Sequence, residues 1–148
     1  MASGSYESAW TSIMSDVINL STDAIKMMLV TASYAPNPDH VFVSDLGGVE
    51  ISGPGYVGGF GGVGRKTLTG KTFTTDPTNN RAKFSAGSVT WSAINAGSPR
   101  YAILIKEGTS DADSRLLAYL DLGTVVTNGG DLTVTPDAVL GLILATMV

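Results

Sequence analysis

The chain has 148 residues, which is enough for a single domain with its own buried core. Charged residues make up only 15% of it, against roughly 25% in ordinary globular proteins, and such a neutral, polar surface is easier to bury in an assembly. A net charge of −4 with scattered basic residues argues against nucleic-acid binding, and the lack of cysteine excludes disulfides and thiol chemistry.

Residues 1–22 are predicted to form an N-terminal helical segment. Apolar side chains at Trp10, Ile13, Met14, Val17 and Ile18 follow the helical period and would form one stripe on a short helix. This stripe either packs on the rest of the domain or docks a partner, and in the second case Trp10 and Ile13 are candidate interface residues. The segment lacks the basic start and apolar core of a signal peptide, so we expect a protein made in the cytoplasm.

Residues 23–148 are predicted to form a β-domain. The segment Ala24–Tyr34 is apolar on both faces and ends before Pro36, which is typical of a central strand. The following segment, Asn37–Leu46, can hold one helical turn before Gly47 stops it.

Short strand-like segments separated by Gly, Asn and Asp turns fill most of the remaining chain. The segments "YAILIKEG" and "LLAYLDLG" flank a polar loop and predict a hairpin. Apolar residues on both faces of these segments indicate a second buried face. The pattern predicts an antiparallel β-sandwich, jelly-roll or Ig-like, with a short N-terminal helix.

Period-two alternation places a set of apolar residues from neighbouring segments on one face. We expect a core built from Phe84, Trp91, Ile103, Ile105, Leu116 and Leu120, with Ala82, Val89 and Ala93 pointing the same way as Phe84 and Trp91. The apolar run Ala138–Val148 is too short to span a bilayer, which takes about 20 residues, so no membrane contact is expected.

A glycine-rich run, "GPGYVGGFGGVGR" (Gly53–Arg65), contains the pattern G-x-G-x-x-G twice. A dinucleotide site would require a helix after the run, but the residues that follow are rich in threonine and strand-like. A P-loop would require glycine where Arg65 stands. The run therefore predicts no nucleotide or other cofactor.

We interpret the glycine-rich run as a flexible surface loop. Its apolar residues Tyr56, Val57, Phe60 and Val63 are candidate protein-interface residues. Because ordering a flexible chain costs roughly 1–2 kcal/mol per residue, we expect the loop to become ordered where a partner covers these side chains.

Residues with the potential for chemistry are few. Asp111 and Asp113 have calcium-loop spacing, but Arg115 follows and no bidentate glutamate stands downstream, so a solvated hairpin tip is favoured. His40 lies beside Asp39 without a nucleophile that would complete a triad. No catalytic, metal or cofactor site is predicted, and we do not expect an enzyme.

Four segments in order, "STDAIKMMLVTASYAPNPDHVFVSDL", "RKTLTGKTFTTDPTNNRAKFSAGSVTWSAINAG", "YAILIKEGTSDADSRLLAYLDLG" and "NGGDLTVTP", carry a resemblance that runs from Ser21 to Pro136. They resemble a family of small tailed-bacteriophage virion proteins that look like capsid decoration (cement) proteins. In these relatives a tyrosine after "SGxG" leads almost directly to the "KTLxGK" strand. Relative to these proteins, the stretch Val57–Gly64 looks like an insertion.

The resemblance implies a virion structural protein on the capsid exterior that bridges and stabilises subunits of the major capsid protein. It also implies self-association, as a homotrimer at local three-fold positions. Two alternatives stay open: a tail or fibre component, and a carbohydrate-binding β-sandwich module with Tyr56, Phe60 and Asp111 as its candidate residues.

Overall fold

Strands that are apolar on both faces form the central sheet of the protein. In the computed structural model, which describes residues 3–146, this sheet has five strands in the order β1-β8-β7-β2-β3, all paired antiparallel. The strands are β1 (Gly4–Ser5), β2 (Lys26–Thr31), β3 (Lys66–Thr67), β7 (Pro99–Lys106) and β8 (Arg115–Asp121). The predicted strand within Ala24–Tyr34 is confirmed as β2, and the predicted hairpin as β7–β8.

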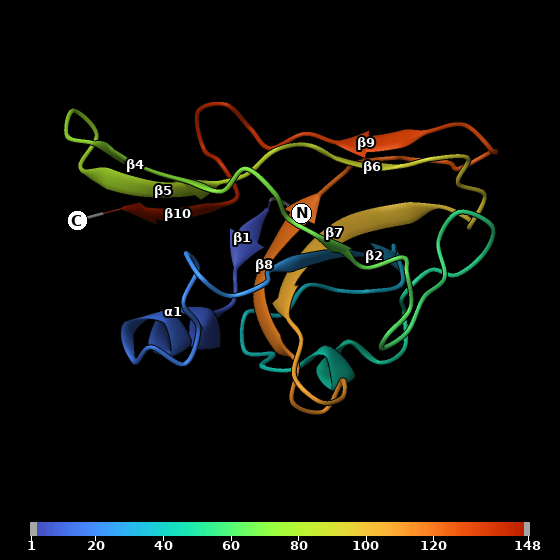
Figure 1. Cartoon of the computed structure of the whole chain (residues 1–148), viewed down its shortest axis with the longest axis horizontal. Coiled ribbons are helices and arrows are strands. Elements are labelled where there is room, and N and C mark those ends of the chain that lie inside the picture. The colour runs from blue at the N-terminus through green and yellow to red at the C-terminus, as the bar shows by residue number, and fades with distance from the viewer. Residues whose placement is uncertain (1–2, 147–148) are drawn as a thin grey trace.

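A second layer lies along one face of the central sheet. It contains a three-stranded sheet, β10-β5-β4, and a two-stranded sheet, β6-β9, both antiparallel and placed end to end (Figure 1). Their bounds are β4 (Thr72–Asp76), β5 (Arg81–Ser85), β6 (Val89–Trp91), β9 (Leu132–Val134) and β10 (Ile143–Thr146). The protein is thus mainly β with antiparallel sheets and a single short helix, as predicted.

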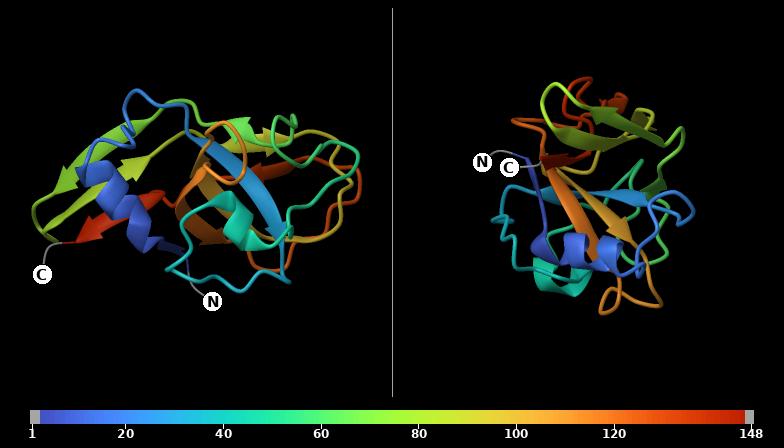
Figure 2. Two further views of the ribbon diagram at one scale, coloured as in Figure 1. Left: turned by 90° about the horizontal axis from the view of Figure 1, so that it is seen from below. Right: turned by 90° about the vertical axis from the view of Figure 1, so that its left-hand side faces the viewer.

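Both helical elements lie on the opposite side of the central sheet from the second layer (Figure 2). They are α1 (Glu7–Met14), which is the predicted N-terminal helix, and the 3₁₀ turn η1 (Val43–Leu46), which ends at Gly47 in the left-handed conformation (φ 78°). Strand β7 is therefore covered on both faces, and this explains the apolar residues that the sequence shows on both sides of the strand.

The N-terminal segment differs from the prediction in two respects. Helix α1 ends at Met14, and Asp16 adopts a left-handed conformation (φ 59°), so Val17 and Ile18 do not continue the helical stripe. Met14 and Val17 are exposed, whereas Ile18 is buried from the turn. The segment also begins with strand β1, which pairs with β8 and joins the central sheet. The predicted stripe is wrong beyond Met14 because the chain changes direction there, after only two turns of helix.

A single buried cluster joins both layers and the helix. Five of the six predicted core residues, Phe84, Trp91, Ile103, Ile105 and Leu116, are buried, and Leu120 is half-buried at a surface cavity. Ala82 and Ala93 are exposed. Ala93 lies in a turn after β6 with φ 49°, which ends the alternation that placed it in the core. The apolar run from Ala138 supplies β10, and its last two residues, 147 and 148, lie outside the described residues.

Trp91 should be the most sensitive position of this core. Its ring is fully buried near the Tyr56 ring, and its indole N–H donates to the Gly64 carbonyl at 2.6 Å. We expect Trp91→Ala to lower the free energy of unfolding by roughly 3–5 kcal/mol, measured by urea denaturation followed by circular dichroism. Trp91→Phe, which keeps most of the volume, should lose less. Equal losses in the two variants would contradict the expectation that the cost comes from the empty space left by the ring.

Candidate functional site

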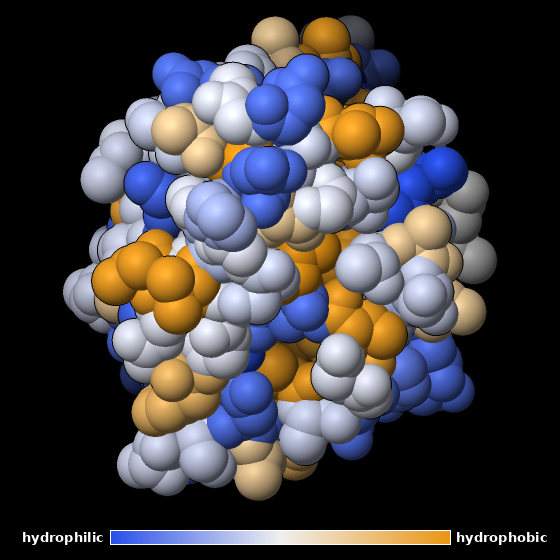
Figure 3. All heavy atoms as spheres, turned by 90° about the vertical axis from the view of Figure 1, so that its right-hand side faces the viewer, coloured by the Kyte–Doolittle hydropathy of each residue, from blue (hydrophilic) through white to orange (hydrophobic). Residues whose placement is uncertain are grey.

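The glycine-rich loop Gly53–Gly64 projects from the end of the molecule that Figure 3 faces, where hydrophobic side chains come to the surface between polar ones. Hydrogen bonds hold its backbone. Gly53 and Tyr56 bond to each other in both directions, Gly64 donates to the Val57 carbonyl at 3.0 Å, and Gly59 donates to the Glu50 carboxylate at 2.9 Å. The loop is thus bonded both internally and to the rest of the protein.

Close packing explains most glycines of this loop better than flexibility does, although Gly59 and Gly61 have open space around them and a positive φ. A Cβ atom at Gly64 would lie 2.5 Å from the Tyr56 ring, and one at Gly62 would meet the Val57 carbonyl oxygen. The expectation of a flexible loop that is ordered only by a partner is therefore corrected: its backbone folds on itself and on the core without one. The sequence pattern is the same in both cases, because glycine serves close approach as well as freedom.

Arg65 follows the loop directly and anchors its end through ion pairs. Its side chain is only 1% exposed, and its guanidinium donates to Glu50 (2.7 Å), Asp111 (2.7 Å) and Glu107 (3.2 Å). Lys26 also pairs with Glu107, at 2.7 Å. These contacts join strand β2, the loop and the β7–β8 hairpin.

The electrostatics of this cluster keep Arg65 charged. Burial alone would lower the pKa of its guanidinium, but the hydrogen bonds to Glu50 and Asp111 more than offset it, so the pKa lies above its ordinary value. Tyr56 lies beside the cluster, donating to Glu50 at 2.8 Å and accepting from the Leu29 N–H at 2.9 Å. Burial and the nearby Glu50 charge raise the pKa of the Tyr56 hydroxyl.

The exposed part of the loop carries three of the four interface residues predicted within it. Val57, Phe60 and Val63 are 54%, 45% and 78% exposed. We call these three side chains the loop tip. Tyr56 does not belong to it and is a correction: it is fully buried, because its ring packs on Gly64 and Trp91 and its hydroxyl is bonded inside the cluster.

The remaining predicted interface residues, Trp10 and Ile13, line an apolar hollow at the other end of the molecule. There the β10-β5-β4 sheet extends beyond the central sheet and faces α1 (Figures 1 and 2). The cavity between them has a volume of about 300 Å³. We call it the helix–sheet groove. Trp10 and Ile13 are half-buried, and the Trp10 indole donates to the Ser5 hydroxyl at 3.0 Å.

Strand register builds the sheet wall of this groove. Opposed residues of antiparallel strands point to the same face, so the pairings give two rows across the sheet: Phe73, Phe84 and Ile143 in one, and Thr75, Ala82 and Ala145 in the other. The first row is bulky, with ring centroids of Phe73 and Phe84 5.3 Å apart, and the second row is small. Because the side chains of the second row are small, a hollow remains between them and α1.

Phe73, Phe84 and Leu20 also line this groove, and sequence reasoning did not assign them to it. Alternation in "KTFTT" and "RAKFS" shows that each phenylalanine shares a face with its strand's small residues, but the register that aligns the two strands comes from pairing. Phe73 is 53% exposed, as expected for a large apolar side chain on an uncovered sheet face.

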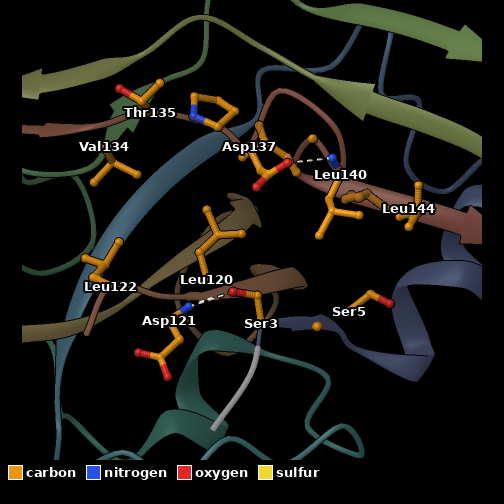
Figure 4. Close-up of a pocket in the computed structure, with 15 residues that line it drawn as sticks. Ser3, Ser5, Leu120, Asp121, Leu122, Val134, Thr135, Asp137, Leu140 and Leu144 are labelled. Carbon is orange, nitrogen blue, oxygen red and sulfur yellow. Dashed lines mark hydrogen bonds between the residues drawn. The ribbon is translucent and has the colours of Figure 1, made fainter.

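A second hollow, of about 460 Å³, lies between β1, β8 and the chain that leads into β10. Figure 4 shows leucines such as Leu120 and Leu140 reaching into it from opposite sides. Its polar groups are bonded within the protein: Asp137 accepts from the Leu140 N–H at 2.8 Å, and the Ser3 hydroxyl accepts from the Asp121 N–H at 2.9 Å. Among the described residues that line the hollow, the two carboxylates are already bonded: Asp121 pairs with Arg100 and Asp137 accepts backbone N–H groups.

The other polar candidates are engaged in local structure. Asp113 accepts from the Thr109 hydroxyl at 2.7 Å and from the backbone N–H groups of Thr109 and Ser110, which lowers its pKa to about 2. Asp111 binds Arg65. The ring of His40 is within hydrogen-bond distance of the Tyr34 hydroxyl, at 3.2 Å. All three residues therefore have structural partners.

Comparison with known proteins gave no family model, no curated protein and no solved structure that matches the chain. Among residues 3–146, no His, Asp and Glu side chains are grouped so that they could hold a metal ion. No helix in this part of the chain has the length and apolarity needed to cross a membrane.

Removal of the buried guanidinium should destabilise the fold strongly. We expect Arg65→Met to lower the free energy of unfolding by about 3 kcal/mol, because Glu50 would stay largely buried without its cation, whereas Glu107 would keep Lys26. The matched control is Arg81→Met, whose pair with Asp76 is more exposed and should contribute about 0–1 kcal/mol. Equal losses in urea denaturation would show that the Arg65 cluster does not anchor the loop.

The packing role of the glycines can be measured separately. Gly64→Ala should cost roughly 1–3 kcal/mol, because the new methyl group would overlap the Tyr56 ring. Gly130→Ala is the control: a Cβ there meets only the Asn128 side chain, at 3.5 Å. If thermal denaturation gave the same midpoint for both variants, the loop would be loosely packed after all.

Proposed function

We propose that the chain is a structural protein of a tailed-phage virion, a decoration protein on the capsid exterior that bridges subunits of the major capsid protein. The observation that carries this proposal is the placement of apolar side chains at two ends of a packed β-scaffold: the loop tip at one end and the helix–sheet groove at the other. The resemblance of residues 21–136 to phage virion proteins is the reason for proposing a phage capsid as the assembly that these surfaces contact.

The mechanism is physical. A scaffold with apolar contacts at both ends can touch two neighbouring subunits at once, and each contact removes apolar area from water. Because many copies would act along every seam of a shell, a small free energy per copy adds up to substantial resistance to opening. The low content of charged residues suits such contacts, since little charge must be desolvated.

The alternatives differ in what the geometry supports. A tail or fibre component would use the same surfaces and differs only in location. A carbohydrate-binding module is favoured less, because Tyr56 is buried and Asp111 is paired with Arg65, which leaves Phe60 as the single candidate at the surface.

Location on the virion tests the proposal directly. We expect immunogold labelling with an antibody against the chain to decorate the heads of intact phage particles uniformly. Labelling of the tail alone would select the tail component, and particles without label would reject a virion role. As a functional readout, capsids that lack the protein should release DNA at a lower temperature, and added purified protein should restore the difference.

A further inference from the structure

We infer that strand β4 is a pairing edge, which takes up an extended segment of the partner subunit as a further strand of the β10-β5-β4 sheet. The inference rests on the proposed function, because the partner is taken to be a subunit of the capsid shell. It deepens that function by naming the chemistry of the contact. Backbone hydrogen bonds along a sheet edge select an extended chain, which apolar contacts alone do not.

The outer side of β4 has no partner within the described chain. β4 pairs with β5 over its whole length, from Thr72 to Asp76. Among residues 3–146 no strand pairs with its other side, and no further backbone hydrogen bond involves residues 72–76. Figure 1 shows β4 as the outermost strand of its sheet. The row of unpaired N–H and C=O groups on this side is complementary to the backbone of another extended chain.

β4 also lacks the features that commonly keep an edge strand from pairing, which are charged side chains, proline and bulges. The segment Thr72–Thr75 consists of threonine and phenylalanine, which favour strands, and its register with β5 is regular. The charges at either end have partners inside the protein. Lys71 donates to two backbone carbonyls of the segment that follows α1, and Asp76 pairs with Arg81.

Length and position distinguish β4 from the other strands at sheet edges. In the part of the chain that the structure describes, β1, β3, β6, β9 and β10 also lie at edges, and each has four residues or fewer. β4 has five. It also borders the helix–sheet groove, so a chain paired with β4 would lie beside the apolar surface that the proposed function assigns to the capsid subunit.

The alternation of side chains defines the segment that fits. Phe73 and Thr75 line the groove, and their neighbours Thr72 and Thr74 are exposed. Side chains of paired strands align on each face of a sheet, so every second side chain of an added strand would extend the groove wall beyond Phe73. The fitting partner is therefore an extended segment with large apolar residues at alternate positions and polar residues between them.

Hydrogen–deuterium exchange of the wild-type chain tests the pairing without any substitution. The probe is the capsid that lacks the protein, and mass spectrometry follows a peptide that covers residues 68–80 in the free and the bound protein. We expect the outer amides of β4 to exchange rapidly in the free protein and to slow by about tenfold or more on binding, since they become hydrogen-bonded. Amides of β6 and β9 serve as the reference and should keep their rates.

Proline substitutions test the same edge through affinity. Successive N–H groups of a strand point to alternate sides, so one of Thr74→Pro and Thr75→Pro removes a bond to β5 and the other removes only an outer N–H. The second is recognised by a melting temperature close to that of the wild type. It should bind capsids about tenfold more weakly, because proline prevents pairing on that side. Valine at the same position keeps the N–H and should bind like the wild type.

The outcomes separate this inference from the proposed function. Capsid binding without slower exchange at β4, or with full affinity in the stable proline variant, would overturn the inference and leave the proposed function standing. A chain that does not bind capsids would overturn both. Slow exchange at β4 that depends on the concentration of the free protein would mean that the edge pairs with a second copy, which would also overturn the inference. If both proline variants unfold, the exchange result decides.

Discussion

The buried guanidinium of Arg65 is the constraint that joins the glycine-rich loop to the rest of this structure. A charge so deeply buried is tolerable only with close partners, and its partners come from segments that are distant in sequence: Glu50 before the loop, and Glu107 and Asp111 in the β7–β8 hairpin. Arg65 also directly precedes strand β3. The ion cluster therefore fixes where the loop leaves and re-enters the scaffold.

The rigidity of the loop follows from that anchor. Once Arg65 is fixed, Gly64 packs on the Tyr56 ring and offers its carbonyl to Trp91, and Gly59 donates to Glu50. A side chain at Gly64 would block the contact with the Tyr56 ring, and Gly59 has a left-handed backbone (φ 91°) that side chains rarely adopt. The apolar side chains that remain outside are thus presented by an ordered backbone, which is the property a protein-binding projection requires.

The proposed function rests on the apolar surfaces of this protein and not on a reactive group. The three-stranded sheet extends past the central sheet and leaves one face open toward α1. Phe73 is 53% exposed at the edge of the helix–sheet groove. The virion proposal depends on such contacts with other proteins.

The sequence by itself determined the local elements: the buried strand β2, the β7–β8 hairpin, the short helix and five of the six core residues all follow from periodicity and turn residues. It could not determine the partners of Arg65, because Glu107 lies 42 positions away and nothing local specifies that pairing. Nor could it distinguish a flexible glycine loop from a packed one, or place Phe73 beside Phe84. Those features were decided by the tertiary structure, since close approach, ion pairing and strand register arise only when distant segments meet.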